Sequence, residues 1–256
     1  MLSRGYEMVF ERTLEQVAMA ATDLDVPLAP FWPVRGAAYD GSLLVIGRSV
    51  NGWVEDWTAR QLRVPAVRRS AVETMRSDAE PVEGCRMRWV TDLWGARDGY
   101  NTHRSAFWRV LRQIVLSDPS PGADVDRWSS RLVWTNLYKV SPALGWNPGA
   151  DLQRAQRQSA IELLKLEVEE FAPRRILALT GGWINPFSDH LGLTLSTRNG
   201  LVEGVAEQGD CAWVVAKHPM KKPEDRFVSE VLAAFAELGA PIRPRPAVGH
   251  IEREEF

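Results

Sequence analysis

Four short apolar runs, separated by segments of helical character, constrain the fold of this chain more than any other feature. They are Leu43–Ile46, Leu132–Trp134, Ile176–Leu179 and Ala212–Ala216. A continuous apolar run of this length is typical of a strand that is buried on both faces of a parallel sheet. Strands of this kind that alternate with helices predict an α/β protein, here a three-layer α/β/α sandwich with a mostly parallel central sheet.

The segments between the runs carry apolar residues three and four positions apart, which is the spacing of one helix face. We expect helices over residues 8–21, 65–79, 106–115, 151–171 and 224–237, with Ser105 and Asp151 as N-caps, and a short strand over 87–90. Residues 24–41 and 92–104 are long loops, rich in proline or glycine. The prediction is one domain over residues 1–256, with an N-terminal helical extension (about 1–40) and an extended C-terminal tail (about 241–256).

Cysteine and histidine usage gives no reason to expect a cofactor or a metal. Cys85 and Cys211 are the only cysteines, so this chain alone cannot hold a four-cysteine iron–sulfur cluster, and a reduced, cytoplasmic setting is the simpler interpretation. The four histidines are scattered without the spacing of metal ligands. The N-terminus has no apolar signal core, and no run approaches the ~18 apolar residues of a membrane span, so we expect no membrane association.

The charge balance argues against a protein that binds nucleic acid through bulk charge. Lysine and arginine number 31 and aspartate and glutamate 33, which gives a net charge of −2. A local basic face remains compatible with this total, because the field near a site matters more than the sum.

Four of the predicted strands end in a cluster of glycine or polar residues. The clusters are Gly47–Gly52, Thr135–Lys139, Thr180–Gly182 and Lys217–Lys222. Ligands of open α/β sheets bind beyond the carboxyl ends of the strands, and in a parallel sheet these ends share one edge. We therefore expect the four clusters to converge on one site.

Three residues of these clusters suggest a chemistry. The amide of Asn136 both donates and accepts hydrogen bonds, as the edges of nucleobases do. An imidazole at a strand end, such as His218, can stabilise an anion that develops on a leaving group, although a structural histidine is the alternative. Ser49 could position water or a phosphate, with an ordinary turn as the alternative.

Other residues suit the contacts that a nucleic acid would need. Asn51 could hold water beside Ser49, and Lys221 and Lys222 suit backbone phosphates as point charges. Gly181 could approach a phosphate closely, although a plain tight turn is the simpler interpretation. Trp53, in a polar loop, could stack on a base or cover the edge of a core.

Taken in order, these clusters resemble the uracil-DNA glycosylase superfamily. The likeness rests on the strand that enters Gly47-Arg48-Ser49-Val50-Asn51-Gly52, on Thr135-Asn136-Leu137-Tyr138-Lys139 followed by Pro142, and on Lys217-His218-Pro219. The segment Ala106-Phe107-Trp108-Arg109 is similar to a helix of the mismatch-specific branch. The likeness spans about residues 40–238 through short motifs. Ser49 stands where the family usually has an acid, Val50 where it often has proline, and Met220 where it has serine.

The resemblance implies a DNA repair hydrolase that flips a uracil-type or modified base out of the strand and cleaves its N-glycosidic bond. Gly47, Asn136, Lys139, Phe107 and Trp53 would contact the base. His218 would stabilise the departing base, while Ser49, Asn51 or Asp56 would hold the water, and Lys221, Lys222 and Gly181 would contact phosphate. The implied partner is nucleic acid, most simply DNA, for a monomer without a cofactor or a metal.

Two alternatives remain open at the level of sequence. The same fold could bind nucleic-acid bases or nucleotides without catalysis, because the usual loop acid is missing. An unrelated α/β hydrolase or nucleotide-modifying enzyme could carry these motifs by chance. That second alternative predicts that Gly47, Asn136 and His218 do not line one pocket.

Overall fold

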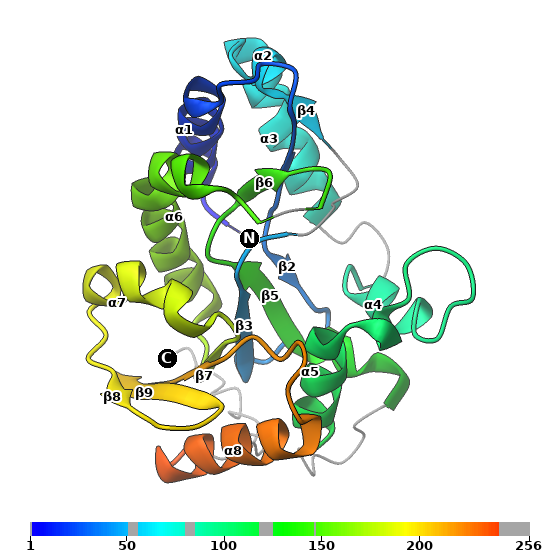
Figure 1. Cartoon of the computed structure of the whole chain (residues 1–256), viewed down its shortest axis with the longest axis vertical. Helices are drawn as coiled ribbons and strands as arrows, with labels where there is room; N and C mark the ends of the chain where they lie inside the picture. Colours follow the sequence, from blue (N-terminus) through cyan, green and yellow to red (C-terminus); the bar gives the residue numbers. More distant parts are fainter. Residues whose placement is uncertain (1, 51–55, 80–84, 118–124, 146, 241–256) are drawn as a thin grey trace, which may run out of the picture.

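The computed structural model describes residues 2–50, 56–79, 85–117, 125–145 and 147–240 (Figure 1). Asn51 and Trp53 lie outside these residues. The elements, in chain order, are α1 (Arg4–Ala20), β1 (Pro27–Pro30), β2 (Val34–Arg35), β3 (Leu43–Gly47), β4 (Trp57–Thr58), α2 (Ala59–Leu62), α3 (Pro65–Ala79), α4 (Arg88–Asp92), η1 (Thr102–Arg104), α5 (Ala106–Leu116), η2 (Val125–Arg131), β5 (Leu132–Asn136), β6 (Val140–Pro142), α6 (Ala150–Phe171), β7 (Arg175–Ala178), η3 (Gly181–Ile184), α7 (Asn185–Leu191), β8 (Ser196–Thr197), β9 (Val202–Gln208), β10 (Cys211–Ala216) and α8 (Glu224–Glu237).

A seven-stranded sheet in the order β2-β5-β3-β7-β10-β9-β8 forms the centre of the molecule. The four strands predicted from the apolar runs, β5, β3, β7 and β10, are parallel neighbours, and antiparallel strands flank them on both sides. The protein is thus α/β with a mixed, mostly parallel central sheet. The chain passes from β3 to β5 on one side and then to β7 on the other, so the strand order reverses at β3. Such a reversal opens a crevice at the carboxyl ends of the strands.

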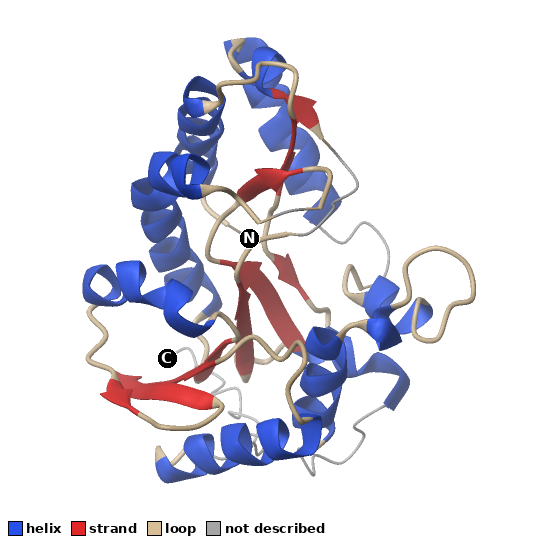
Figure 2. Cartoon of the chain, viewed as in Figure 1, coloured by secondary structure: helices blue, strands red, loops and turns tan. Residues whose placement is uncertain are grey.

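Helices cover both faces of this sheet (Figure 2). Alternate residues of a strand point to opposite faces. Accordingly, Leu44 and Ile46 of β3 pack into a core with α6 and α7, whereas Leu43 and Val45 pack into the other core with α5 and α8. These two cores make a three-layer arrangement and explain why the strand has no polar residue.

The N-terminal segment belongs to the folded body. Tyr6 and Phe10 of α1 pack against Trp32 in a third core, which α1 shares with α2, α3 and α6. The segment also gives β2 to the edge of the central sheet and β1 to a small antiparallel sheet in the order β4-β1-β6. The helical extension that we predicted therefore contributes a core of its own.

Some local predictions were wrong. The strand expected over residues 87–90 is the N-cap and first turn of helix α4. Met87, the N-cap, and Val90 are both buried, because positions three apart share a helix face. Strand β9 was not predicted, because Glu203, Glu207 and Gln208 interrupt its apolar residues. Helix α6 begins after Gly149, which puts Asp151 in the first turn instead of at the cap.

No helix in the described parts of the chain is both long enough and apolar enough to cross a bilayer.

Candidate functional site

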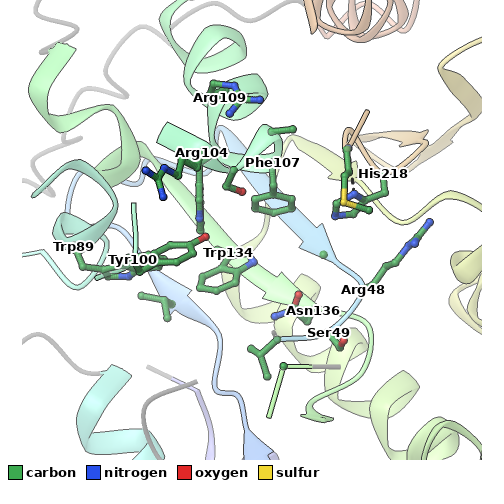
Figure 3. A pocket seen from close by; sticks show the side chains of 18 of the residues that line it. Arg48, Ser49, Trp89, Tyr100, Arg104, Phe107, Arg109, Trp134, Asn136 and His218 are labelled. Carbon is green, nitrogen blue, oxygen red and sulfur yellow. Dashed lines mark hydrogen bonds between the residues drawn. The ribbon is translucent and has the colours of Figure 1, made fainter. Parts of the chain in front are cut away.

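A cavity of about 1190 Å³ lies at the carboxyl ends of β3 and β5, beside the start of α5 and the segment that follows β10 (Figure 3). Six of the residues predicted from the sequence line it: Gly47, Ser49, Phe107, Asn136, His218 and Lys221. The alternative of a chance likeness predicts that Gly47, Asn136 and His218 do not line one pocket, and that prediction is wrong.

Backbone hydrogen bonds hold the ends of β3 and β5 together. The amide of Leu137 donates to the carbonyl of Gly47 at 2.9 Å, and that of Tyr138 donates to the carbonyl of Arg48 at 3.0 Å. The two strands therefore stay paired past their last residues. This pairing keeps the side chains of Ser49 and Asn136 in one corner of the cavity.

Asn136 is the most informative residue of this corner. Only 1% of its surface is exposed, and its Nδ2 has no hydrogen-bond partner within the described structure. A Cβ at Gly47 would overlap Oδ1 of Asn136, so the glycine makes room for this amide. A buried donor without a partner costs about 1–3 kcal/mol, and a ligand that accepts a hydrogen bond removes that cost.

His218 lies across the cavity from Asn136, with its ring 6.4 Å from that of Phe107 between centroids. The amide of Met220 donates to Nδ1 of His218 at 3.3 Å, so a neutral ring carries its proton on Nε2. Burial, and then the charge of Arg48, lower the pKa of His218 to about 4. Near neutral pH the residue therefore presents a neutral N–H donor.

Arg48 is held beside this histidine by two contacts. Its Nε donates to the carbonyl of Thr180 at 2.9 Å, and its guanidinium lies 5.2 Å from the ring centroid of Trp183. Burial lowers the pKa of Arg48, while Glu203 opposes that shift. These contacts fix a positive charge that disfavours a second proton on His218.

Ser49 and Asn147 form a polar pair in the same cavity. The hydroxyl of Ser49 donates to Oδ1 of Asn147 at 3.0 Å. Of the described residues that line the cavity, Asp78 is the only carboxylate, and it lies exposed at the end of α3. The pair can orient a water molecule, but it supplies no base near neutral pH.

Aromatic rings build one wall of the cavity. The ring of Trp134 in β5 lies between those of Phe107 in α5, at 6.4 Å, and Trp89 in α4, at 6.0 Å between centroids. The ring of Tyr100 lies beyond Trp89, 6.2 Å from it. Trp108 also lines the cavity, with its ring centroid 5.1 Å from that of Trp134. The wall offers ring faces on which a planar ligand can stack.

The lining of the cavity is basic, although the whole chain carries −2. Its described charged residues are Asp78 and the basic residues Arg48, Arg86, Arg104, Arg109 and Lys221. Arg109 is engaged in an ion pair with Glu224 of α8. The excess of positive charge suits an anionic ligand.

Four predicted site residues lie elsewhere. Lys139 is fully buried, and its Nζ contacts Glu167 at 2.7 Å and the carbonyl of Asn136 at 2.6 Å, so it cannot touch a ligand. Asp56 is exposed outside the cavity, and neither Lys222 nor Gly181 lines it. The backbone of Gly181 has a positive φ of 57°, as the alternative interpretation of a plain tight turn requires.

Sequence reasoning missed several lining residues. Arg48 follows Gly47, and a positive charge at the end of a predicted strand was the signal that could have identified it as a site residue. Asn147 follows a turn-rich stretch without a motif of its own. Trp89 and Tyr100 come from the segments expected to be a strand and a loop, so nothing in the sequence brought them together.

No family model matches the chain, and no curated protein matches it significantly. Within the residues that the structure describes, no three histidine, cysteine, aspartate or glutamate side chains gather as a metal site would require.

Proposed function

We propose that this protein is a DNA glycosylase, a hydrolase of the uracil-DNA glycosylase type that releases a uracil-type or modified base from DNA. The observation that carries the proposal is the unpartnered, buried Nδ2 of Asn136 in a cavity that also contains His218 and Gly47. The basic lining supports a nucleic-acid strand as the ligand.

Recognition of the base would use both ends of the Asn136 amide. Nδ2 donates to a carbonyl oxygen on the base edge, and Oδ1 accepts from the neighbouring ring N–H. Phe107 covers the face of the base. The base enters this site by leaving the stack of its strand, at a cost of a few kcal/mol.

Cleavage breaks the bond between C1′ of the sugar and the ring nitrogen of the base, and the electron pair stays on the base. His218 donates a hydrogen bond from Nε2 to the oxygen on which this negative charge collects. A water molecule held by Ser49 and Asn147 adds to C1′ and releases its proton to solvent. Without a nearby carboxylate the sugar cation gains less support, so we expect slow turnover.

That missing carboxylate also favours a second candidate function, which is base binding without chemistry. The same Asn136 and Phe107 would hold a base, and no bond would break. This candidate differs from the first only in turnover.

A base-release assay separates the two. Labelled single- and double-stranded oligonucleotides that contain uracil, hypoxanthine or a mismatch are incubated with the protein, and alkali then reveals abasic sites. We expect cleavage that His218→Ala abolishes and that His190→Ala, an exposed histidine of α7, leaves intact. Binding that Asn136→Ala weakens, without any cleavage, would favour the second candidate. A protein that neither cleaves nor binds these oligonucleotides would refute both candidate functions.

A further inference from the structure

The cavity extends well beyond the residues that would hold one base. Pockets of about 300–1,000 Å³ hold drug-sized ligands, and this cavity measures about 1190 Å³. A single nucleobase between Asn136, Phe107 and His218 is smaller than such ligands. The remaining space is lined by Trp134, Trp89 and Tyr100.

These rings form a continuous row from the base site to solvent. Successive centroids from Phe107 to Tyr100 are 6.0–6.4 Å apart. Burial falls from Trp134 outward: Trp134 is 8% exposed, Trp89 is half-buried and Tyr100 is 55% exposed. Figure 3 shows the ring of Tyr100 beside Trp89, on the side of the cavity opposite His218. Tyr100 packs against Trp89, yet more than half of its surface stays exposed, so a large part of the residue is accessible to a ligand.

The loop that carries Tyr100 is built to hold this ring in place. Oδ1 of Asn101 accepts hydrogen bonds from the amides of Gly95 (3.1 Å) and His103 (2.9 Å), and its Nδ2 donates to the carbonyl of Ala96 (2.8 Å). The hydroxyl of Thr102 donates to the carbonyl of Val90 in α4 at 2.7 Å. The backbone of the loop is therefore held before a ligand binds, and ordering it adds little to the entropic cost of stacking on Tyr100.

Positive charge accompanies the row. Arg104, which is exposed, lines the same cavity, and Figure 3 shows it above Tyr100 and Trp134. Sites that bind single strands without strong sequence preference combine a basic groove with aromatic rings that stack on successive bases. In a duplex the neighbouring base is already stacked and paired, so its faces reach protein rings only at the cost of unstacking and unpairing it.

We propose that Trp89 and Tyr100 form a second base site, for the nucleotide next to the flipped one, and that the protein therefore prefers single-stranded DNA. This inference rests on the proposed function for the identity of the ligand as DNA, and it names the substrate class of the same cavity. It does not depend on whether the base is released.

Binding to strands that contain no base for release tests it. Fluorescence anisotropy is measured with a dye-labelled oligothymidine strand, with an abasic strand of the same length, and with the oligothymidine strand paired to its complement. The abasic strand keeps every phosphate and lacks every base. The variants are Tyr100→Ala, Tyr100→Phe and Met19→Ala, the last an exposed apolar residue of α1.

We expect the wild type to bind oligothymidine more tightly than the duplex. Tyr100→Ala should weaken binding of oligothymidine by roughly five- to 150-fold, the factor for one base stacked on an aromatic ring, and should leave binding of the abasic strand unchanged. Tyr100→Phe should retain the affinity, because it keeps the ring, and Met19→Ala should behave as the wild type.

The inference fails if Tyr100→Ala weakens both strands equally, if it weakens neither, or if the duplex binds as tightly as the single strand. These results are separate from the base-release assay. A protein that cleaves both kinds of DNA without needing Tyr100 would keep the proposed function and lose the inference. A protein whose binding needs Tyr100 but which cleaves neither DNA would keep the inference and lose the proposed function.

Discussion

At the scale of the single residue, Gly47 decides whether Asn136 can adopt its position. A Cβ at residue 47 would overlap Oδ1 of Asn136, and that clash falls on a side chain with almost no free space. Gly47→Ala should therefore lower the free energy of unfolding by about 1–3 kcal/mol. It should also reduce base release by roughly 2- to 13-fold, the factor for one lost hydrogen bond between neutral groups.

Both effects are measured on one variant, by urea denaturation and by the base-release assay. Gly182→Ala is the matched control, since a Cβ there has its nearest neighbour at 3.7 Å. Gly47→Ala with normal activity would contradict the assigned role of Asn136.

His218 gives a residue-scale prediction about pH. With a pKa of about 4, the imidazole stays neutral until well below its ordinary range. A second proton would sit on Nδ1 and break the hydrogen bond from the amide of Met220 that orients the ring. The value of kcat/KM should therefore begin to fall near pH 4 instead of near pH 6.5. Arg48→Met removes the second cause of the shift and keeps the first, which is burial. The acid limb should then move to higher pH but stay below 6.5.

The same shift affects stability. Between pH 6.5 and 4 the unfolded chain binds a proton at this ring that the folded protein does not, so the free energy of unfolding falls as the pH drops through that window. For the activity prediction, an acid limb of kcat/KM at the same pH in Arg48→Met and in the wild type would show that Arg48 does not act on His218.

At the scale of the element, the buried pair of Lys139 and Glu167 joins three parts of the fold. Glu167 of α6 accepts from Tyr6 of α1 at 2.6 Å and from Thr135 of β5 at 2.7 Å, while Lys139 follows β5. Burial raises the pKa of Tyr6, with a further contribution from Glu167, and burial lowers the pKa of Lys139 against the opposing effect of Glu167.

Lys139→Met should lower the free energy of unfolding by about 3–5 kcal/mol, because it leaves the Glu167 carboxylate buried without its cation. The double variant Lys139→Met/Glu167→Gln should recover part of this loss. Arg154→Ala, which breaks an exposed pair with Asp151, should cost at most about 1 kcal/mol. Urea denaturation measures all three. A cost for Lys139→Met as small as that of Arg154→Ala would contradict the structural role of the pair.

The elements also show what the sequence could predict. The four apolar runs are all parallel strands, and the polar ends of three of them meet in the cavity at Gly47, Asn136 and His218, because both properties follow from local pattern and sheet geometry. The fourth end, Thr180–Gly182, does not line the cavity. Lys139 was assigned to the ligand because the resemblance, which includes its cluster, implies that role. Its burial follows from Glu167, a carboxylate 28 residues away on the inner face of α6, and only tertiary packing brings the two together.

At the scale of the whole molecule, the net charge and the charge of the cavity have opposite signs. The chain carries −2, yet its cavity contains more basic than acidic side chains. Salt screens charges farther apart than about 10 Å at 0.1 M, so the basic residues of the cavity dominate what a bound strand experiences. Affinity for single-stranded DNA should therefore fall as salt rises. The slope of log K against log of the salt concentration should be about −0.7 for each phosphate contacted.

Arg104→Gln tests whether this attraction is local. It should reduce the salt slope by about 0.7, the contribution of one phosphate contact on a single strand. Arg154→Gln changes the net charge of the chain by the same amount at a position on α6 outside the cavity, where the side chain of Arg154 is 73% exposed, so its slope should equal that of the wild type. Equal slopes in the two variants would mean that total charge governs binding. The basic lining of the cavity would then have no special part in holding the strand.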